Sequence, residues 1–499
     1  MKPGVMNAVG WTLLLALAAA AVGCAVGPRY TRPAVPVSAA FKEQPPAGWK
    51  TAQPSDAAVR GRWWEVFADP ALSALEDQVS VSNQSLAQAD ARFRGARAAV
   101  QEARAGLFPT VSAGATASRS RASANRGSTA GSQGTQGSSG GGGTSTSYQL
   151  PVDFSWEADL WGRVRRTVEA NAAEAQASAA DVEATRLSLQ AELAADWFQL
   201  HGLDEQKQLL DTTIAAFERA LQINVNRHDQ GIASGADVAQ AQTQLEATRA
   251  QALDLDVSRT ALEHAIAILA GKPPADLTIP RAGLRDAPPQ VPVELPSDLL
   301  ERRPDVAAAE RRVAAANAQI GVAMAAYFPS LTVNASAGFE SGTLSKLLSL
   351  PSRFWSVGPA LMETLFDGGR RRAVTAQARA SYDAAVAAYR ENVLTALQEV
   401  EDNLAALRVL EAEATQEDLA VAAAERSLEL ARTRYTGGIA SYLEVITAQN
   451  AALTAERASV EIRVRRMTAS VSLIRALGGG WEGSGVVYRP APMATSLAR

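Results

Sequence analysis

The sequence predicts a mainly α-helical protein with some β-structure, built as two internal repeats, because motifs recur, long stretches lack proline and short segments alternate in polarity. Residues 227–242 (RHDQGIASGADVAQAQ) recur as residues 434–449 (RYTGGIASYLEVITAQ) at an offset of 207. The motif LFP at 107–109 recurs as YFP at 327–329, at an offset of 220. The offset falls by 13 because the first copy carries an extra Gly/Ser-rich loop, residues 126–147, whose composition cannot form a packed core.

The chain starts with a predicted secretory signal. Lys2 precedes an apolar run over residues 9–22 that ends in Gly23-Cys24 and is too short to span a bilayer permanently. A small residue before the lone cysteine matches a bacterial lipobox, although Ala21 stands where leucine is usual. We therefore expect cleavage after Gly23 and a diacylglycerol and an N-acyl lipid on Cys24, with no other cofactor. The alternative is an ordinary cleaved signal with an incidental cysteine.

Each repeat contains two segments of period-two alternation, which is typical of strands with one apolar and one polar face. They cover about 109–120 and 147–158 in the first repeat, and about 329–340 and 353–365 in the second. Strands of roughly ten alternating residues are what a membrane β-barrel requires, although a soluble sheet shows the same pattern. The aromatic residues near the predicted strand ends form either an interfacial belt or ordinary packing: Trp156, Trp161, Phe354 and Trp355.

A long helix and a returning helix follow each pair of strands. Residues 160–227 and 367–434 lack proline, and the second stretch spaces its apolar residues by four and three, as in a helix-packing seam. The return helices are predicted over 235–270 and 441–477. At ~1.5 Å per residue each long helix would run about 100 Å, so each repeat predicts a long helical hairpin.

These elements define the predicted domain boundaries. They are a signal peptide 1–23, a lipidated extended segment 24–69, a first repeat 70–271, a Pro-rich connector 272–300, a second repeat 301–478 and a flexible tail 479–499. The first repeat opens with one Ala-rich helical stretch, about 70–106. A helical membrane span is not expected after the signal, because no later run is long and apolar enough.

Four strands cannot close a membrane barrel alone, because the smallest such barrels have eight strands and unpaired edges are costly in lipid. We therefore expect the chain to share a barrel with copies of itself. Three chains would give twelve strands and two would give eight, and counting strands leaves both open.

The sequence resembles the TolC-like family of outer-membrane efflux channels, in its NodT/OprM-like lipoprotein branch. The similarity rests on CAVGPRYTRP at 24–33, WWEVFADPAL at 63–72 and, above all, LPSDLLERRPDVAAAERRVAAANAQIGVAMAAYFPSLTVNASAG at 295–338. The resemblance extends from Cys24 to about Gly478.

This resemblance implies a homotrimer with a shared twelve-stranded β-barrel and a long periplasmic α-helical barrel in the Gram-negative outer membrane. It implies docking to a periplasmic adaptor (a membrane fusion protein) and to an inner-membrane pump of the RND type. The implied function is a passive exit duct for drugs or other small toxic compounds. The pump supplies the energy, so no enzymatic activity is expected.

Channels of this family narrow their periplasmic end with acidic side chains just after the helix turn. The resemblance places Glu444 at one acidic ring position and Thr447 at the second, where this sequence lacks the carboxylate, and the offset of 207 pairs Asp237 with Glu444. Rings of carboxylates favour cations and respond to protonation. The alternative is a solvated carboxylate at a helix start, which the helix dipole favours. Tyr435 and Arg434, beside the same turn, are further gate candidates.

Glycines mark both predicted helix turns. Gly231 and Gly235 lie at the first turn, and Gly437 and Gly438 at the second. They permit tight turns that the adaptor would meet. The RRPD motif at 302–305 is expected to form structural ion pairs.

Composition excludes several function classes. A net charge of −4 over 499 residues gives no nucleic-acid-binding surface. His201, His228 and His264 show no ligand spacing, so no metal site is expected. Two alternatives remain open, namely a type I protein-secretion duct working with an ABC exporter and a non-pore periplasmic coiled-coil scaffold.

Overall fold

The computed structural model describes residues 25–35, 38, 40–43, 61–121, 123, 144–284, 288–289 and 303–479. The predicted signal peptide, Cys24, most of the Gly/Ser-rich loop and the tail from residue 480 lie outside these residues. The chain divides into two compact units. The first comprises residues 1–32, 95–175 and 312–385, and the second residues 33–94, 176–311 and 386–499.

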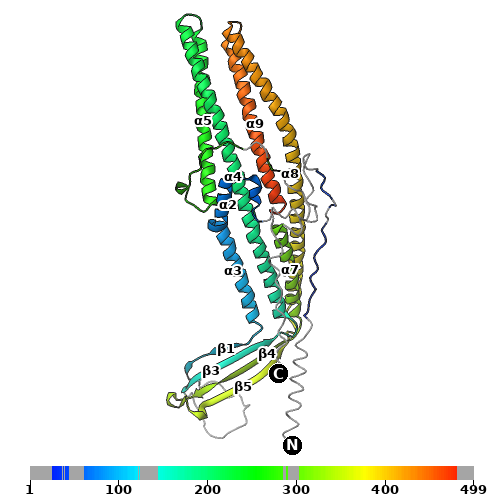
Figure 1. Cartoon of the computed structure of the whole chain (residues 1–499). Helices are drawn as coiled ribbons and strands as arrows, with labels where there is room; N and C mark the ends of the chain where they lie inside the picture. The colour runs from blue at the N-terminus through cyan, green and yellow to red at the C-terminus, as the bar shows by residue number, and fades with distance from the viewer. Residues whose placement is uncertain are drawn as a thin grey trace. The chain divides into compact units, whose positions relative to one another are not determined.

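The first unit contains an antiparallel sheet (Figure 1). Its strands are β1 (Thr110–Ala113), β2 (Thr116–Arg121), β3 (Thr144–Ala158), β4 (Ser330–Ser341) and β5 (Arg353–Met362). Both β1 and β2 pair with β3, β3 pairs with β4, and β4 pairs with β5. The predicted four strand segments within a mainly helical chain are confirmed, with the first segment divided in two.

That division has a physical cause in the neighbouring strand. β1 ends at Ala113 and β2 begins at Thr116, and the gap between them faces Pro151 of β3. Proline has no N–H to donate to a ladder. Only the carbonyl of Pro151 contributes, accepting from the N–H of Gly114 at 3.0 Å, so the ladder is interrupted although the chain continues in the same direction.

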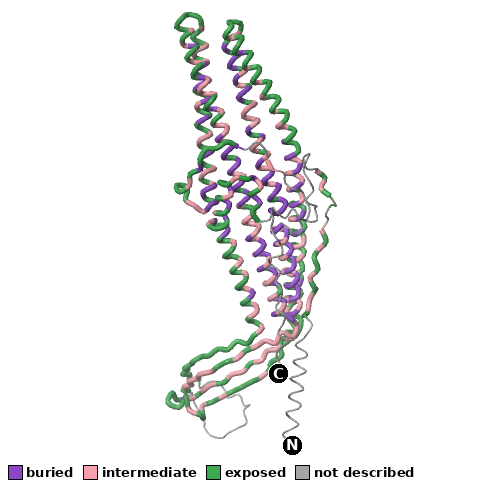
Figure 2. Tube along the Cα trace, in the orientation of Figure 1, coloured by how far each residue is buried: buried purple, intermediate pink, exposed green. Residues whose placement is uncertain are grey.

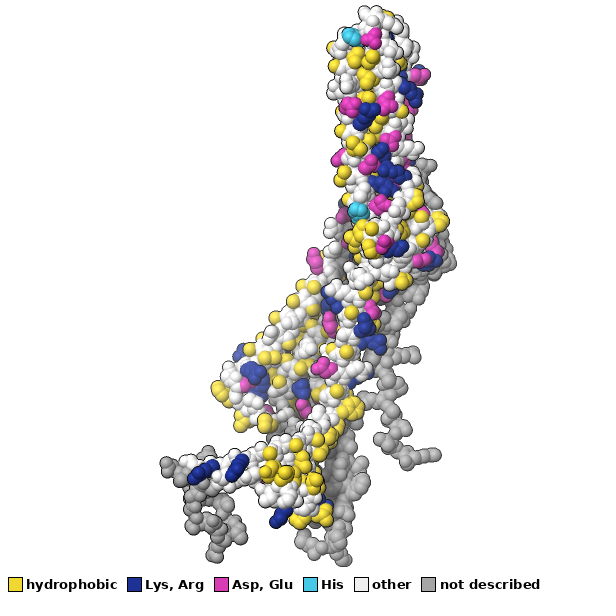
Figure 3. All heavy atoms as spheres, turned by 90° about the vertical axis from the view of Figure 1, so that its left-hand side faces the viewer, with side chains coloured by type: hydrophobic (Ala, Val, Ile, Leu, Met, Phe, Trp, Pro, Cys, Tyr) yellow, Lys and Arg dark blue, Asp and Glu magenta, His cyan; other side chains and the backbone are white. Residues whose placement is uncertain are grey.

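Apolar and polar side chains form separate rows across the sheet, because paired residues lie on the same face and successive residues on opposite faces. Two apolar rows are Val111, Phe154, Ala335 and Val357, and Ala113, Val152, Ala337 and Trp355. Between them runs the polar row Ser112, Asp153, Ser336 and Ser356. No strand residue is buried within its own chain (Figure 2), and Figure 3 shows hydrophobic side chains gathered over part of the sheet. Among the residues that the structure describes, nothing buries the apolar face of the sheet.

The long helices reproduce the repeat residue for residue. They are α4 (Arg163–Asp229) and α8 (Arg370–Thr436), each of 67 residues, and α5 (Gly235–Leu269) and α9 (Tyr442–Ala476), each of 35 residues. Corresponding ends lie 207 positions apart. The shorter helices α3 (Gln84–Ala105) and α7 (Pro304–Ala325) have 22 residues each and lie 220 apart. The two predicted repeats are confirmed.

A hydrophobic core in the second unit is formed by a short 3-10 turn, η2 (Trp63–Phe67), and α2 (Pro70–Ser82), packed on the long helices. The Phe67 ring lies 4.9 Å from that of Phe198 of α4. Ile279 and Leu284 also enter this core. The predicted extended segment 24–69 and connector 272–300 thus contribute buried residues, which their composition did not indicate.

The predicted single helix over 70–106 is broken at Asn83. Its side-chain oxygen accepts from the N–H groups of Ser85 and Leu86 at 2.8 and 3.0 Å, and its amide donates to the carbonyl of Leu269 at 2.8 Å. Asn83 therefore caps α3 and binds the end of α5 at the same time, so two helices replace one.

Arg303 of the RRPD motif forms the ion pairs expected there. The buried guanidinium contacts Asp305 and Glu399, each at 2.6 Å, and donates to the carbonyl of Ala476 at 3.0 Å. Arg303 therefore joins the start of α7 to α8 and to the end of α9. Arg302 lies outside the described residues.

Candidate gate at the helical tips

The two long hairpins of the second unit run side by side (Figure 1) and end in matching turns, here called the tips. The first tip is residues 230–234 and the second tip is residues 437–441. In each, the carbonyl of an arginine, Arg227 or Arg434, accepts from the amide five residues later, at 2.8 and 2.9 Å respectively. This hydrogen bond ends a helix with a residue in the left-handed conformation.

Glycine fills that left-handed position in both tips. Gly231 has φ 75° and Gly438 has φ 72°, a conformation that costs a side-chain-bearing residue free energy. Gly235 and Gly437 do not have positive φ, and a Cβ added to Gly235 would meet its nearest neighbour, His228, at 3.7 Å. The turn geometry therefore requires two of the four predicted glycines.

Glu444 forms an ion pair with Arg434 across the second tip. The Nη1 of Arg434 lies 3.2 Å from Oε2 of Glu444, and the two side chains are 54% and 46% exposed. Such a pair contributes little to folding, about 0.5 kcal/mol. The pair does hold the Glu444 carboxylate against the last turn of α8. Breaking the ion pair would therefore release the Glu444 carboxylate to another position.

Asp237, the counterpart of Glu444 in the first repeat, has a different role. Its carboxylate accepts from the N–H of Ser234 at 3.0 Å and from its hydroxyl at 2.8 Å, and its own N–H donates back to that hydroxyl at 3.2 Å. This is a capping box that satisfies the start of α5. Ser441, at the equivalent position, makes no side-chain cap. Asp237 therefore has a local structural role at the start of α5, whereas Glu444 has none of this kind.

Thr447, at the second ring position of the family pattern, is exposed, and its hydroxyl donates to the carbonyl of Leu443 at 2.9 Å. It adds polarity to the start of α9 but no charge. The second ring position of the family pattern therefore carries no carboxylate in this chain.

Tyr435 joins the second hairpin to the first. Its hydroxyl donates to Oδ1 of the buried Asn224 at 2.8 Å, and the guanidinium carbon of Arg227 lies 4.8 Å from the centre of its ring. Burial raises the pKa of Tyr435, and the positive charge of Arg227 opposes that rise. The hydroxyl therefore remains a protonated donor near neutral pH.

Tyr442 packs against Tyr435, with the ring centres 5.5 Å apart. It is only 3% exposed, and among the described residues its hydroxyl has no hydrogen-bond partner. Burial raises its pKa. Val445, Ile446 and Ala241 complete this small apolar core beneath the tips, which binds α9 to α5.

Below this core a pair of side-chain amides joins α5 to α9. Gln244 and Asn450 exchange two hydrogen bonds, of 2.7 and 3.2 Å, and seven residues farther on Arg457 donates to Gln251 at 3.3 Å. The internal repeat over residues 227–242 and 434–449 does not include these four residues. Extending the repeat alignment beyond residue 242 would have paired them to within one position.

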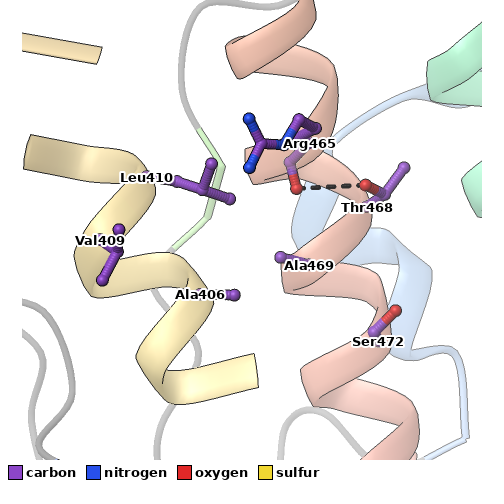
Figure 4. Close-up of a pocket in the computed structure, with 7 residues that line it drawn as sticks. All are labelled: Ala406, Val409, Leu410, Arg465, Thr468, Ala469 and Ser472. Atoms are coloured by element: carbon purple, nitrogen blue, oxygen red, sulfur yellow. Dashed lines mark hydrogen bonds between the residues drawn. The ribbon is translucent and has the colours of Figure 1, made fainter. Parts of the chain in front are cut away.

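A groove of about 320 Å³ lies between α8 and α9, farther from the tips (Figure 4). Its lining includes one charged residue, Arg465, which pairs with Glu413 at 3.3 Å, and the Thr468 hydroxyl donates to the Arg465 carbonyl at 3.1 Å.

The described residues contain no cluster of His, Cys, Asp or Glu that could hold a metal ion. None of the helices that the structure describes has a stretch long and apolar enough to cross a membrane.

Comparison with known proteins decides the family. The pattern of the family described as outer membrane efflux protein matches residues 75–272 and 295–479, which is most of the chain. The chain belongs to the outer membrane efflux protein family. It is 33% identical over 489 residues to the probable efflux pump outer membrane protein TtgC of Pseudomonas putida, covering 97% of this chain and 99% of the relative. It is 35% identical over 479 residues to outer membrane protein OprJ of Pseudomonas aeruginosa, covering 94% and 95%.

Solved structures of outer membrane efflux proteins share the whole fold. The outer-membrane channel OprN is 32% identical with a TM-score of 0.82, covering 92% of this chain and all of that one. The MtrE channel of Neisseria gonorrhoeae, described in its open state, is 29% identical with a TM-score of 0.76, covering 92% and 98%.

Membership in the outer membrane efflux protein family makes this chain an outer-membrane channel that extends into the periplasm, and not an enzyme. The alternative of a coiled-coil scaffold without a pore is therefore wrong.

Proposed function

We propose that this chain is the lipid-anchored, trimeric exit duct of a tripartite RND-type efflux system, carrying drugs or other small toxic compounds out of the periplasm. The observation that carries this proposal is the antiparallel sheet. Its two edge strands and its apolar face have no partner among the described residues, and the same chain carries two matched helical hairpins. Similar proteins support the cargo, since they include an antibiotic efflux pump protein, ArpC, and a toluene efflux pump protein, TtgC, both of Pseudomonas putida.

The tips support docking to a periplasmic adaptor. Ile232 and Ile439 are 63% and 75% exposed, at equivalent positions of the two tips. Three chains would present six such isoleucines, each beside a glycine turn. An apolar side chain at every tip suits a partner that meets the tube end-on.

Glu444 is the proposed gate residue. Glu444→Ala removes the carboxylate that Arg434 holds, and we expect the closed channel to conduct more ions in planar bilayers. A matched control is Glu413→Ala, which breaks a similarly exposed ion pair with Arg465 away from the tips. Equal conductance of wild type and Glu444→Ala would remove Glu444 from the gate and leave the duct proposal standing.

Cys24 is the proposed lipid attachment point. The N-terminal peptide of the purified protein is expected to carry acyl chains, detected by its mass. A Cys24→Ala variant is expected to lose them.

Crosslinking in cells, followed by mass spectrometry of what is purified with the chain, tests the assembly. Recovery of a periplasmic adaptor and a proton-driven RND pump is the expected result. Recovery of an ABC exporter would overturn the efflux proposal in favour of the type I secretion duct.

A further inference from the structure

The residues that directly follow Cys24 are held where the strands of the first unit meet its helices. The N–H of Val26 donates to the carbonyl of Trp161 at 3.0 Å, and Trp161 lies three residues beyond the end of β3. The Trp161 indole in turn donates to the carbonyl of Pro329 at 2.8 Å, directly before β4. The segment after the cysteine is therefore fastened to the helix-side end of the sheet.

Arg166, in the first turn of α4, makes most of the polar contacts to this segment. The Nε of Arg166 donates to the carbonyl of Val26 at 3.2 Å, and Nη2 donates to those of Gly27 and Pro28 at 3.3 and 3.1 Å. Its Nη1 pairs with Glu169 at 2.8 Å, and its side chain is 8% exposed. A guanidinium has five donors in a fixed plane, so Arg166 can bind three successive carbonyls and Glu169 together, which exceeds the three donors of a lysine.

Glycines on both sides shape the site for a bare backbone. Gly27 has φ 106°, and a Cβ there would lie 2.5 Å from the Cα of Gly321 of α7. A Cβ on Gly162 would lie 3.0 Å from Ala25. Asn317, one turn before Gly321, donates to the Pro28 carbonyl at 3.2 Å. The segment and its surroundings fit closely enough that a side chain at either glycine would force them apart.

We propose that Arg166, Asn317, Gly162 and Gly321 form a docking site for Ala25–Pro28, and that this docking site fixes where the lipid anchor begins. Consecutive Cα atoms are about 3.8 Å apart, so a docked Ala25 keeps the acylated residue one step from the strand–helix junction. An undocked chain could reach farther by about 3.5 Å for every residue released. Arg166 is thus a positioning residue for the anchor, which rests on the lipidation proposed above, whereas docking itself does not need the lipid.

Proteolysis of the intact trimer reports whether the segment is docked. Trypsin can cut the Arg29–Tyr30 bond next to the site, whereas Arg32 precedes Pro33 and resists cleavage. The full chain, purified in detergent, is treated with trypsin, and the N-terminal peptide ending at Arg29 is followed by mass spectrometry. Slow release is expected from the wild type.

Two variants remove the docking in different ways. Arg166→Gln loses the contacts to three carbonyls, and we expect the release rate to rise about tenfold or more. Gly27→Ala leaves Arg166 in place but adds a clash and backbone strain, and a similar rise is expected. The control is Arg163→Gln, in the same turn of α4 as Arg166, which removes a partly exposed ion pair with Glu157 of β3 and should change the rate less than about twofold.

The outcome separates docking from lipidation. Wild-type release rates in Arg166→Gln and Gly27→Ala, both still trimeric on unheated gels, would overturn the docking site. The mass of the released peptide reports acylation independently. A peptide without acyl chains would contradict the lipid anchor, and the effect of the variants on release would still decide the docking.

Discussion

The two tyrosines beneath the second tip differ in what their hydroxyl groups do. The hydroxyl of Tyr435 reaches Asn224 in the other hairpin at 2.8 Å, whereas that of Tyr442 is buried without a partner in the described part of the chain. A buried unpaired hydroxyl costs free energy, while a paired one contributes modestly. Tyr442 therefore stabilises the tips through its ring, and Tyr435 through its ring and its hydrogen bond.

Removing each hydroxyl should affect stability differently. Tyr435→Phe leaves the Asn224 oxygen unpaired and is expected to lower the free energy of unfolding by about 1 kcal/mol. Tyr442→Phe removes an unpaired group and is expected to be neutral or stabilising by up to about 1 kcal/mol. Thermal unfolding followed by circular dichroism measures both. An equal loss in the two variants would show that Tyr442 has a hydrogen-bond partner after all.

Asp196 of α4 gives the fold a pH dependence. Burial, with the nearby charge of Glu192, raises its pKa from 3.8 to about 6. Between these two pKa values the folded chain keeps a proton that the unfolded chain releases. The contribution of Asp196 to the free energy of unfolding therefore falls as the pH rises from about 4 to 6, and it stays constant above pH 6. Asp196→Asn should therefore stabilise the chain at pH 7, by about 1 kcal/mol after allowing for partial exposure. Well below pH 3.8, where Asp196 is protonated in both the folded and the unfolded wild type, the variant should match it. Equal melting temperatures of variant and wild type at pH 7 would contradict the prediction.

The two hairpins have the same backbone turn, but the helices that follow the turns are capped differently. The first hairpin starts α5 with the Ser234–Asp237 capping box, whereas Ser441 gives α9 no side-chain cap and the Arg434–Glu444 pair takes its place. A cap contributes about 1 kcal/mol to a helix start, and an exposed ion pair less. The α8–α9 hairpin is thus the more easily opened of the two.

The tips should tolerate a methyl group according to backbone conformation. Gly438→Ala places alanine at φ 72° and is expected to destabilise its turn by about 1 kcal/mol. Gly235→Ala, on the first residue of α5 with no close neighbour, is the matched control and should be neutral or slightly stabilising. Amide hydrogen exchange at residues 437–444 measures the first effect. Unchanged exchange in Gly438→Ala would mean that the turn has another accessible conformation.

Long elements were predictable because period and repetition act over many residues. The ends of α4 and α8 lie within three residues of their predicted bounds. The breaks at Asn83 and Pro151 were not predicted, because each depends on a partner distant in sequence. Asn83 needs the carbonyl of Leu269, and the effect of Pro151 appears only on the strand beside it.

The sequence predicted which residues lie at the tips better than it predicted which residues they contact. Glu444, Arg434 and Tyr435 were identified beside the turn, but the contact of Tyr435 with Asn224 crosses between hairpins, and no local pattern encodes it. The capping role of Asp237 was predictable, because a serine three residues before an acidic residue, here Ser234, is the signature of a capping box.

For the whole molecule, the sheet is the part that a single chain leaves incomplete. β5 forms one edge, and β1 with β2 forms the other. Each unpaired backbone group in lipid costs several kcal/mol. Pairing β5 of one chain with β1 and β2 of the next removes both edges at once, and this is the physical basis of the proposed trimer.

A proline on the outer side of β5 tests that pairing. Pro359 has no N–H and therefore occupies a position of β5 whose backbone N–H does not point toward β4. Positions two residues apart in an antiparallel ladder point the same way, so the N–H of Val357 also points away from β4, toward the free edge. Val357→Pro therefore removes a donor from the free edge and leaves the β4–β5 ladder intact. We expect it to prevent trimers that survive unheated gel electrophoresis, while Val357→Thr, which keeps the N–H, retains them. Stable Val357→Pro trimers would show that this edge does not pair between chains.

The equal lengths of corresponding helices link the evolution of the two halves of the gene. Tyr435 meets Asn224 only because both hairpins reach the same level. Inserting seven residues into each of the two arms of one hairpin would move its tip by about 10 Å, so half of the six tips in a trimer would no longer reach a shared partner. Insertions and deletions in these helices should therefore persist in a lineage only when the other half of the gene acquires the same change.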